Sequence, residues 1–332
     1  MIKRNILILG SEGNRAAISI VRALQKENYV INIAISNNNK SDRFAFINYS
    51  DNFLYYDDHN SKDFIKSLIE FKNIIGKYYI FCLGDRKTEW LIKNKEILND
   101  NNIEFEAPTY NSFKKMVYKR NFINNAKMNG LLVPPQISLE EAHNSLLNKD
   151  FIVLKAKNKF TLEKYKTPII VDKFRKLEEY DLDKYSFIIQ KYIKGPSVYY
   201  CAYYKKGEKI SSFSQINLVQ QPGGGSVLKA APYNIDENII IKTDQMFKKL
   251  DWSGVMMIEF KIENNIYYAI ECNPRYWGPN QLLVDNGINF PLIMLEGKGI
   301  IDDKIKMNRG YKWRNGYFLG YINKFRGLGK FQ

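Results

Sequence analysis

The sequence predicts an α/β segment with an open parallel sheet over roughly the first hundred residues, followed by an α+β region with antiparallel strands. The first part alternates apolar runs with helical patterns and begins with a strand at residues 6–9 that ends at Gly10. The next helix shows apolar residues at helical spacing: Ala17, Ile20, Val21 and Leu24. The second part instead pairs apolar strands across tight turns at residues 206–207 and 264–265.

The remaining elements follow from the same patterns. Further parallel strands are expected at residues 30–35 and 78–83, and a helix at 111–129. Ser138 and Glu141 form a capping box that opens another helix. The strands expected in the second part are residues 151–155, 168–171, 187–193, 198–204, 209–219, 254–261 and 266–271, with helices at 172–180 and 236–250.

Length and composition exclude several classes of protein. With 332 residues, 45% of them apolar, the chain is long enough for two or three domains with real cores. Cys82, Cys201 and Cys272 lie far apart without a CxxC pair, which argues against a cysteine zinc cluster or a disulfide framework. No stretch approaches the roughly 18 apolar residues of a membrane-spanning helix. We therefore expect a cytoplasmic protein.

The net charge of +15 is ambiguous. Such an excess of Lys and Arg is typical of proteins that bind nucleic acid, membrane surfaces or anionic small ligands. The chain is also crowded with Asn, Lys, Ile and Tyr, which suggests compositional drift in an AT-rich genome. The charge alone therefore does not select a function.

The first strand is followed by a glycine turn, Gly10-x-x-Gly13, which could hold a phosphate at a helix N-terminus. The turn is shorter than the dinucleotide fingerprint GxGxxG, and the second strand ends at Ser36-Asn37 without an acidic residue. These observations favour a tight turn that faces a ligand cleft over an NAD site.

The strongest chemical signal is a pair of glutamates on apolar strands, Glu259 and Glu271. Burying a carboxylate is costly unless a positive charge meets it. We expect an odd-length turn near Asn265 to place the two opposite each other on one sheet face, with Asn273 on the same face. Two carboxylates and an amide oxygen suit Mg²⁺, and Arg275 would project beside the metal. The alternative is a pair of solvated glutamates, one of them salt-bridged to Arg275.

The series Glu259…Glu271-x-Asn273-x-Arg275 resembles the magnesium signature of the ATP-grasp superfamily in order and spacing. The resemblance covers about residues 1–300. It implies a Rossmann-like pre-ATP-grasp domain followed by a two-lobed ATP-grasp domain of the carbamoyl phosphate synthetase-like type. It also implies two Mg²⁺ ions, with Mn²⁺ as a substitute, that bridge the phosphates of ATP, and an arginine that holds the acyl phosphate or its tetrahedral successor. The implied domains are 1–108 (N-terminal), 109–190 (linker helix and lid lobe), 191–303 (lobe with the metal site) and 304–332 (basic aromatic tail).

The resemblance implies an ATP site drawn from further positions. Lys119 and Lys155 would contact the phosphates as positive point charges from separate elements. Gln190, Lys191 and Ile193 stand in the linker that would recognise adenine, with an edge strand that offers backbone groups and with Ile193 packed on the ring. Either lysine taken alone could instead be a solvated surface residue.

The chain departs from the superfamily pattern at several positions. Tyr118 precedes Lys119 where Asp is usual, and Gln190 replaces a common Glu. Ser197 stands near the ribose-binding position, where an acidic residue is common. The lid loop at residues 156–161 contains no glycine, although the superfamily normally uses a glycine-rich loop to cradle phosphates.

A run of three glycines that ends at Gly225 lies between apolar strands, and close approach to a ligand would explain its conformational cost. In relatives that join carboxylates to amines, a similar segment lines the acceptor side of the site. The resemblance therefore implies substrate contacts at Gly224, Gly225 and Ser226. Those relatives often carry arginines where this chain has Gln215 and Asn217. The alternative is a flexible loop.

We therefore expect an ADP-forming ligase that uses ATP to join a small carboxylate to an amine through an acyl phosphate. The block from Trp252 to Gly278 most resembles ligases that accompany surface-polysaccharide or peptide-tailoring enzymes. The alternatives within the superfamily are a carboxylase and a phosphotransferase. Dimers are common in the superfamily, so a homodimer is compatible with this expectation.

The C-terminal tail leaves a different class of function open. Residues 304–330 contain eight Lys or Arg interleaved with aromatic residues. Such a mixture suits a structural cap, contact with an anionic membrane surface, or stacking on nucleic acid. Glycines and a weak helical period favour the structural cap, and no nucleic-acid partner is expected.

Overall fold

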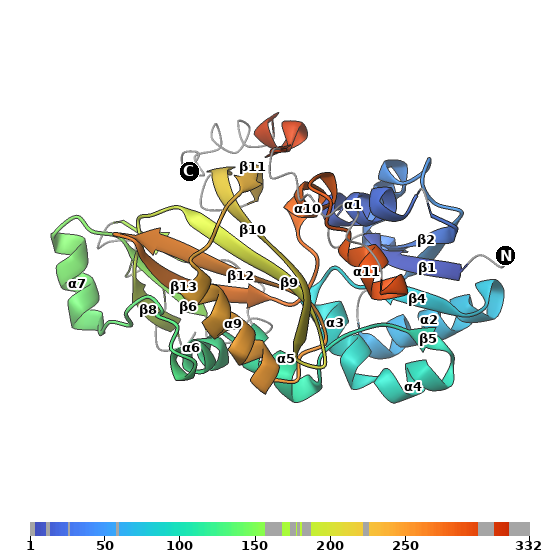
Figure 1. Cartoon of the computed structure of the whole chain (residues 1–332), viewed down its shortest axis with the longest axis horizontal. Coiled ribbons are helices and arrows are strands. Elements are labelled where there is room, and N and C mark those ends of the chain that lie inside the picture. Colours follow the sequence, from blue (N-terminus) through green and yellow to red (C-terminus); the bar gives the residue numbers. More distant parts are fainter. Residues whose placement is uncertain are drawn as a thin grey trace.

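The chain folds into a parallel sheet and two antiparallel sheets (Figure 1). The computed structural model describes residues 4–10, 14–25, 27–57, 60–156, 168–172, 177, 180, 187–221, 226–297 and 309–318. Among the described residues, no helix has the length and apolar character needed to cross a membrane.

The N-terminal part is a five-stranded parallel sheet with the strand order β3-β2-β1-β4-β5. Its strands are β1 (Arg4–Leu9), β2 (Tyr29–Ser36), β3 (Asn52–Tyr56), β4 (Tyr78–Phe81) and β5 (Ile103–Glu104). The segments between them include α1 (Asn14–Leu24), the 3-10 segment η2 (Asn37–Ala45), α2 (Ser61–Ile75), α3 (Asp85–Lys93) and α4 (Lys95–Asp100). The predicted Rossmann-like α/β order is confirmed.

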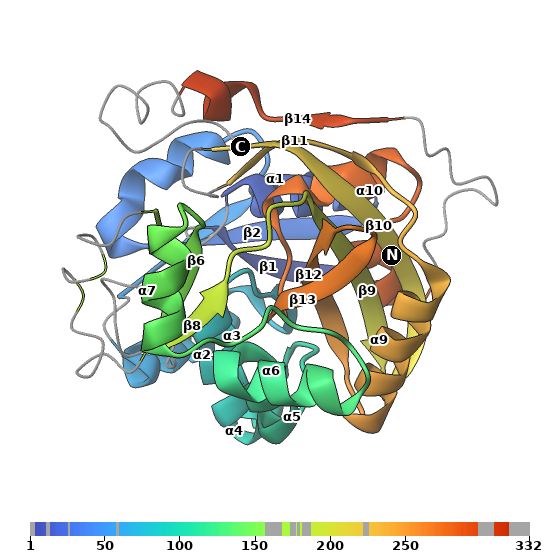
Figure 2. The same ribbon diagram turned by 90° about the vertical axis from the view of Figure 1, so that its left-hand side faces the viewer.

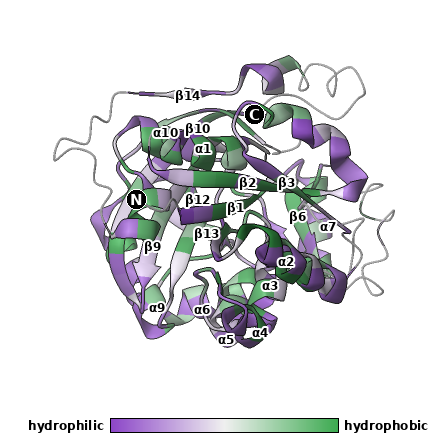
Figure 3. Ribbon diagram, turned by 90° about the vertical axis from the view of Figure 1, so that its right-hand side faces the viewer, coloured by the Kyte–Doolittle hydropathy of each residue, from purple (hydrophilic) through white to green (hydrophobic). Residues whose placement is uncertain are grey.

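This parallel sheet is buried on both faces, as its continuous apolar strands require. On β1, Ile6 and Ile8 pack with α1 in one core cluster, whereas Leu7 and Leu9 pack with α2 in another. Successive side chains of a strand point to opposite faces, so both clusters are filled from the same strand. Figure 3 shows β1 and β2 as predominantly apolar strands.

The helix predicted over residues 111–129 is in fact two helices, α5 (Tyr110–Val117) and α6 (Lys119–Met128). Tyr118 lies between them in an extended conformation, with φ −76° and ψ 124°, which interrupts the helical hydrogen bonding. The sequence does not reveal this break because tyrosine is also compatible with a helix interior. As a consequence, Lys119 is the first residue of α6.

A small antiparallel sheet with the order β7-β6-β8 lies in the segment that is expected to form the lid lobe. It consists of β6 (Ile152–Ala156), β7 (Ile169–Val171) and β8 (Phe187–Lys191), covered by α7 (Leu139–Leu147). The predicted capping box is present, because the Ser138 side chain accepts from the Glu141 backbone and the Glu141 side chain accepts from that of Ser138. The helix expected at residues 172–180 lies largely outside the described residues.

The main antiparallel sheet has the order β13-β12-β9-β10-β11-β14. Its strands are β9 (Ser197–Lys205), β10 (Glu208–Gln220), β11 (Val227–Pro232), β12 (Gly254–Glu263), β13 (Ile266–Asn273) and β14 (Tyr311–Lys312). The accompanying helices are α9 (Glu237–Lys249), η4 (Gly278–Asn280), α10 (Gln281–Asp285) and α11 (Phe290–Glu296). The hairpin predicted at Lys206-Gly207 is confirmed, and both turn residues have positive φ angles, 49° and 75°.

One apolar cluster joins the two large sheets. It contains Ile20 from α1, Cys201 from β9, Met257 from β12 and Tyr276 just after β13, all of them buried. The opposite face of the antiparallel sheet packs separately against α6 and α9. The sheet face that carries the candidate site is therefore held against the N-terminal domain by a shared core.

The described part of the basic tail belongs to this fold. β14 pairs with β11 along the edge of the sheet (Figure 2), and the backbone N–H of Trp313 donates to the Leu228 carbonyl at 2.7 Å. The Arg15 guanidinium lies 3.9 Å from the centre of the Trp313 ring and donates to the Val227 carbonyl at 2.8 Å. A structural role is thus confirmed for residues 309–318, and a membrane contact of the tail stays a prediction.

Gly195 lies on the loop between β8 and β9, where the backbone passes close to β12. A Cβ atom at this position would lie 1.4 Å from the Ile262 carbonyl oxygen. We expect Gly195→Ala to lower the free energy of unfolding by about 2–3 kcal/mol, because the backbone must shift to accommodate the methyl group. Urea unfolding measures this change. Gly310→Ala is the control, since its Cβ would meet only the Ala230 carbonyl at 3.5 Å. Equal stability of the two variants would contradict the close approach.

Candidate functional site

The two glutamates of the predicted metal site face each other across β12 and β13. Glu259 and Glu271 are register partners in the antiparallel pair, so their side chains lie on the same sheet face. Asn273 pairs with Met257 two residues further along and shares this face. Directly opposed like charges destabilise a sheet unless cations compensate them.

A β-bulge, and not the odd-length turn that the sequence suggests, produces the pairing of Glu259 with Glu271. The turn has two residues, Asn264 and Asn265, both with positive φ angles of 52° and 60°. An uninterrupted ladder from that turn would place Glu259 opposite Ile270. The register shifts between Glu259 and Phe260, so Ile270 becomes the extra residue of a β-bulge and Glu271 moves opposite Glu259.

The bulge also binds the lysine of the lid lobe. Lys155, on β6, donates from Nζ to the Ile270 carbonyl at 3.2 Å and is only 4% exposed. Burial and the neighbouring Lys119 lower the pKa of Lys155 to about 8, whereas Glu271 and Glu259 act in the opposite direction. The predicted pair of lysines is therefore brought to the glutamates from two separate elements.

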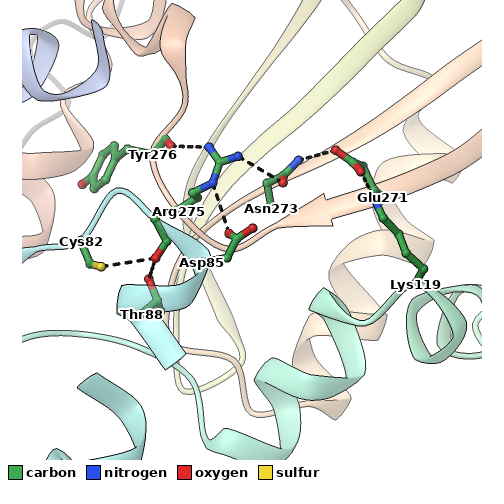
Figure 4. A network of polar contacts seen from close by, with 9 residues as sticks. Cys82, Asp85, Thr88, Lys119, Glu271, Asn273, Arg275 and Tyr276 are labelled. Carbon is green, nitrogen blue, oxygen red and sulfur yellow. Dashed lines mark hydrogen bonds and ion pairs between the residues drawn. The ribbon is translucent and has the colours of Figure 1, made fainter. Parts of the chain in front are cut away.

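Lys119 forms an ion pair with Glu271 (Figure 4). The ammonium reaches the carboxylate because the break at Tyr118 places Lys119 at the start of α6, which packs on β13. Its side chain is 9% exposed, against 23% for Glu271. The reading of Lys119 as a solvated surface lysine is therefore wrong.

Glu259 is half-buried in the site and accepts a hydrogen bond from a neighbouring hydroxyl group. Burial raises the pKa of its carboxyl group, and the charge of Glu271 raises it further. A hydrogen bond from the Ser197 hydroxyl to Oε1, at 2.7 Å, opposes this shift, as do the charges of Lys261 and Lys155. Ser197, which the resemblance places near ribose, thus contacts the predicted metal ligand.

Arg275 connects this site to the N-terminal domain (Figure 4). Its Nη2 lies 3.4 Å from the Asn273 side-chain oxygen, and its Nη1 donates to the Tyr276 carbonyl at 3.1 Å. Its Nε lies 3.2 Å from a carboxylate oxygen of Asp85, in the first turn of α3. Asn273 in turn donates to Glu271 at 3.0 Å, so one polar network runs from Asp85 to Lys119.

The linker expected to recognise adenine is only partly available. Gln190 is buried and donates from its side chain to the Pro134 carbonyl at 3.1 Å. The backbone N–H of Lys191 donates to the Pro135 carbonyl at 3.0 Å, so adenine recognition by the remaining backbone groups of this linker stays a prediction. The chain before α7 runs beside β8 and takes up this edge. Ile193 is buried just beyond the covered stretch.

Several expected residues lie outside the described part of the chain. These are Gly224 and Gly225 of the glycine run and residues 157–161 of the lid loop. Ser226 is described and exposed, and its carbonyl accepts from the Gln221 N–H at 3.0 Å. Substrate contacts of this loop therefore stay predictions.

The site's donor set fits a hard divalent cation. Glu259 and Glu271 provide opposed carboxylates and Asn273 provides an amide oxygen, which are the ligand types that Mg²⁺ prefers. Among the described residues, no group of three His, Cys, Asp or Glu side chains forms a self-sufficient metal site. This incomplete set suits an ion that takes its remaining ligands from water and phosphate oxygens.

Two residues of the site were not singled out from the sequence. Asp85 directly follows a glycine at the end of β4, and the carboxyl ends of parallel strands commonly face a ligand, so its position was a usable signal. Tyr199 pairs with Glu259 from β9, and burial and both glutamates raise the pKa of its hydroxyl. No sequence pattern marks Tyr199, because its place depends on the register of β9 with β12.

The lowered pKa of Lys155 makes stability depend on pH. Below about pH 8 Lys155 is protonated in both the folded and the unfolded chain, so the folded state bears the full free-energy cost of burying its charge. Between about pH 8 and 10.5 the unfolded chain binds more protons, so the folded state gains as pH rises. We expect the unfolding free energy of the wild type to rise by about 1–2 kcal/mol relative to Lys155→Met between pH 7.5 and 9.5.

Urea unfolding at both pH values measures this change. Lys66→Met, at a side chain that is 76% exposed, is the matched control and should show no such trend. A constant difference between the wild type and Lys155→Met would contradict the lowered pKa.

Comparisons with known proteins place this geometry in a known fold. No protein family and no curated protein sequence matches the chain. The structure of Campylobacter jejuni biotin carboxylase, in complex with β,γ-ATP, matches with a TM-score of 0.62 and 18% identity over 95% of this chain and 72% of that one. Rhizobium etli pyruvate carboxylase matches with a TM-score of 0.67 and 16% identity, over 93% of this chain but only 30% of the carboxylase.

A third match belongs to a different kind of enzyme. It is the ADP complex of an N5-carboxyaminoimidazole ribonucleotide synthetase, with a TM-score of 0.58 and 14% identity over 82% of this chain and 70% of that one. The match to biotin carboxylase covers 95% of this chain and therefore includes both the parallel N-terminal sheet and the antiparallel part. The chain therefore has the ATP-grasp fold, as the resemblance of its magnesium signature predicts.

Proposed function

We propose that this protein uses Mg·ATP to activate a small carboxylate as an acyl phosphate and then transfers the acyl group to an amine. The observation that carries the proposal is the facing pair Glu259 and Glu271, with Lys119 paired to Glu271 and Lys155 bonded to the neighbouring Ile270 carbonyl. Opposed, half-buried carboxylates with two buried lysines beside them suit a polyphosphate and its metal ion.

The first step would transfer the γ-phosphoryl group. An oxygen of the substrate carboxylate attacks the γ-phosphorus, the bond to the bridging oxygen breaks, and ADP leaves. Glu259, Glu271 and Asn273 would hold Mg²⁺, or Mn²⁺ in its place, which supplies neutralisation of phosphate charge when bound. Lys119 and Lys155 would contact phosphate oxygens, and Lys119 would exchange part of its ion pair with Glu271 for them.

The second step would join the two substrates. The amine nitrogen attacks the acyl carbon, inorganic phosphate leaves, and the nitrogen gives up its proton to solvent or substrate. Arg275 lies beside Asn273 and would stabilise the negative charge that develops on the acyl oxygen. The ion pair with Asp85 holds the Arg275 guanidinium in place, so the N-terminal domain contributes to this step.

A carboxylase is the second candidate. It is supported by the similarity to biotin carboxylase structures over most of this chain. A carboxylase would release ADP with bicarbonate as the carboxylate, whereas a ligase would require an organic acid and an amine. Involvement in surface-polysaccharide or peptide tailoring and a homodimer rest on the sequence resemblance, and a cytoplasmic location rests on composition; all three stay part of the proposal.

Glu271→Gln tests the metal assignment. It removes one of the two facing charges and the partner of Lys119 while preserving side-chain shape. We expect Mg·ATP-dependent ADP release to fall by about 100-fold or more. The assay is a screen of carboxylates, with hydroxylamine as a general amine acceptor so that a hydroxamate reports the acyl phosphate.

The control is Glu208→Gln, which removes an exposed carboxylate that pairs with Lys248 on the far side of the sheet. The control should retain wild-type ADP release. Undiminished activity in Glu271→Gln would show that Glu271 is not a metal ligand.

Asp85→Asn tests the proposed support of Arg275. The substitution keeps the side-chain shape but weakens the contact with the guanidinium. We expect kcat to fall about 10-fold with KM for ATP unchanged, because Asp85 contacts Arg275, whose proposed role is at the acyl oxygen and not at the phosphates of ATP. Asp85→Glu should restore part of kcat. A parallel loss of ATP affinity would argue for a general structural role instead.

A further inference from the structure

A row of polar side chains crosses the sheet away from the metal site. Glu271, Glu259, Tyr199 and Gln215 are successive register partners on β13, β12, β9 and β10. Register partners share a sheet face, and neighbouring strands lie about 4.8 Å apart. Gln215 is therefore two strands, about 10 Å, from Glu259 on the same face. Asn217 lies two residues further along β10 and also faces this side.

The two amide side chains at the end of this row are buried with unused hydrogen-bonding capacity. Gln215 is 1% exposed and Asn217 is 8% exposed. Within the described part of the chain, Gln215 Oε1 has no hydrogen-bond partner, and neither side-chain amide atom of Asn217 has one of good geometry. The Asn217 amide lies near the Tyr199 hydroxyl, whose pKa it lowers slightly against the larger effect of burial. Buried amides normally have partners, so these positions point to a ligand.

The surroundings of these amides define the chemistry of that ligand. On the same face of β10 the next residue toward the hairpin is Phe213, which belongs to the apolar core. Across the strand pair, Gln215 faces Pro232 and Asn217 faces Ala230. The amides present both donors and acceptors over an apolar floor, and neither they nor these β11 partners carry a charge. The complement of such a surface is an uncharged group that both donates and accepts hydrogen bonds.

We propose that Gln215 and Asn217 form a substrate subsite for an uncharged hydroxyl- or amide-bearing group, such as the hydroxyls of a sugar acid or amino sugar. This inference rests on the proposed function, because the row begins at the metal and phosphate site. The reacting carboxyl carbon would lie near Glu259 and Arg275, and the remainder of the substrate would extend over Tyr199 to the amides. A second carboxylate on the substrate, at the end near Gln215 and Asn217, would be buried against neutral groups.

The first test asks whether Gln215 serves a ligand or the fold. If its amide oxygen is unpaired in the free protein, Gln215→Leu leaves the urea midpoint unchanged or raises it, because it removes a buried unsatisfied polar atom. Gln245→Leu, at an exposed position on α9, is the matched control. A lower urea midpoint for Gln215→Leu than for Gln245→Leu would show that Gln215 is structural and would overturn the subsite.

The second test measures substrate preference. Gluconate and succinate are compared as carboxylates with hydroxylamine as acceptor, and glucosamine and glutamate are compared as amines. We expect the neutral hydroxyl-rich member of each pair to have at least a 10-fold higher kcat/KM, and Gln215→Leu to abolish that preference. Preference for succinate or glutamate, with hydroxamate still formed, would overturn the subsite and leave the ligase proposal intact. Absence of hydroxamate and ADP with every carboxylate would overturn the ligase proposal and with it the subsite.

Discussion

The opposition of two half-buried glutamates is the constraint on which the rest of the site depends. Glu259 and Glu271 occupy facing positions on neighbouring strands, where like charges repel and burial disfavours ionisation. The chain offsets this by bringing Lys119 from α6 and Lys155 from β6 to the same place. Each lysine comes from a different part of the fold, so the position of α6 and that of the lid lobe are both coupled to the carboxylates.

Local irregularities of the backbone make this arrangement possible. The bulge at Ile270 shifts the register so that the carboxylates meet, and its carbonyl then accepts from Lys155. The extended Tyr118 divides what would be one helix and places Lys119 at the start of the second. Departures from regular secondary structure often occur at functional sites, and here both lie directly beside the predicted ligands.

The N-terminal domain both packs against the antiparallel sheet and supplies a residue, Asp85, to the candidate site. Its parallel sheet shares an apolar cluster with the antiparallel sheet, which fixes α3 relative to β13. Asp85 consequently reaches Arg275, and the polar network of the site crosses the boundary between the two parts of the chain. The tail residue Trp313 packs on Arg15 in a similar way at the other edge of the sheet. The candidate site is therefore built jointly by residues distant in sequence.

The amino-acid sequence alone is enough to predict the class of fold and the set of candidate ligands. Strands and helices follow from apolar periodicity, and the order Glu259, Glu271, Asn273 and Arg275 is visible in the chain, because both are local properties. Which of these groups come into contact is fixed by the packing of distant elements. The bulge, the helix break at Tyr118 and the contact with Asp85 depend on packing between distant elements, which short-range pattern does not encode. The buried amides on β10 are likewise recognised only once the sheet register is known, since their burial and unused hydrogen-bonding capacity are properties of the assembled sheet.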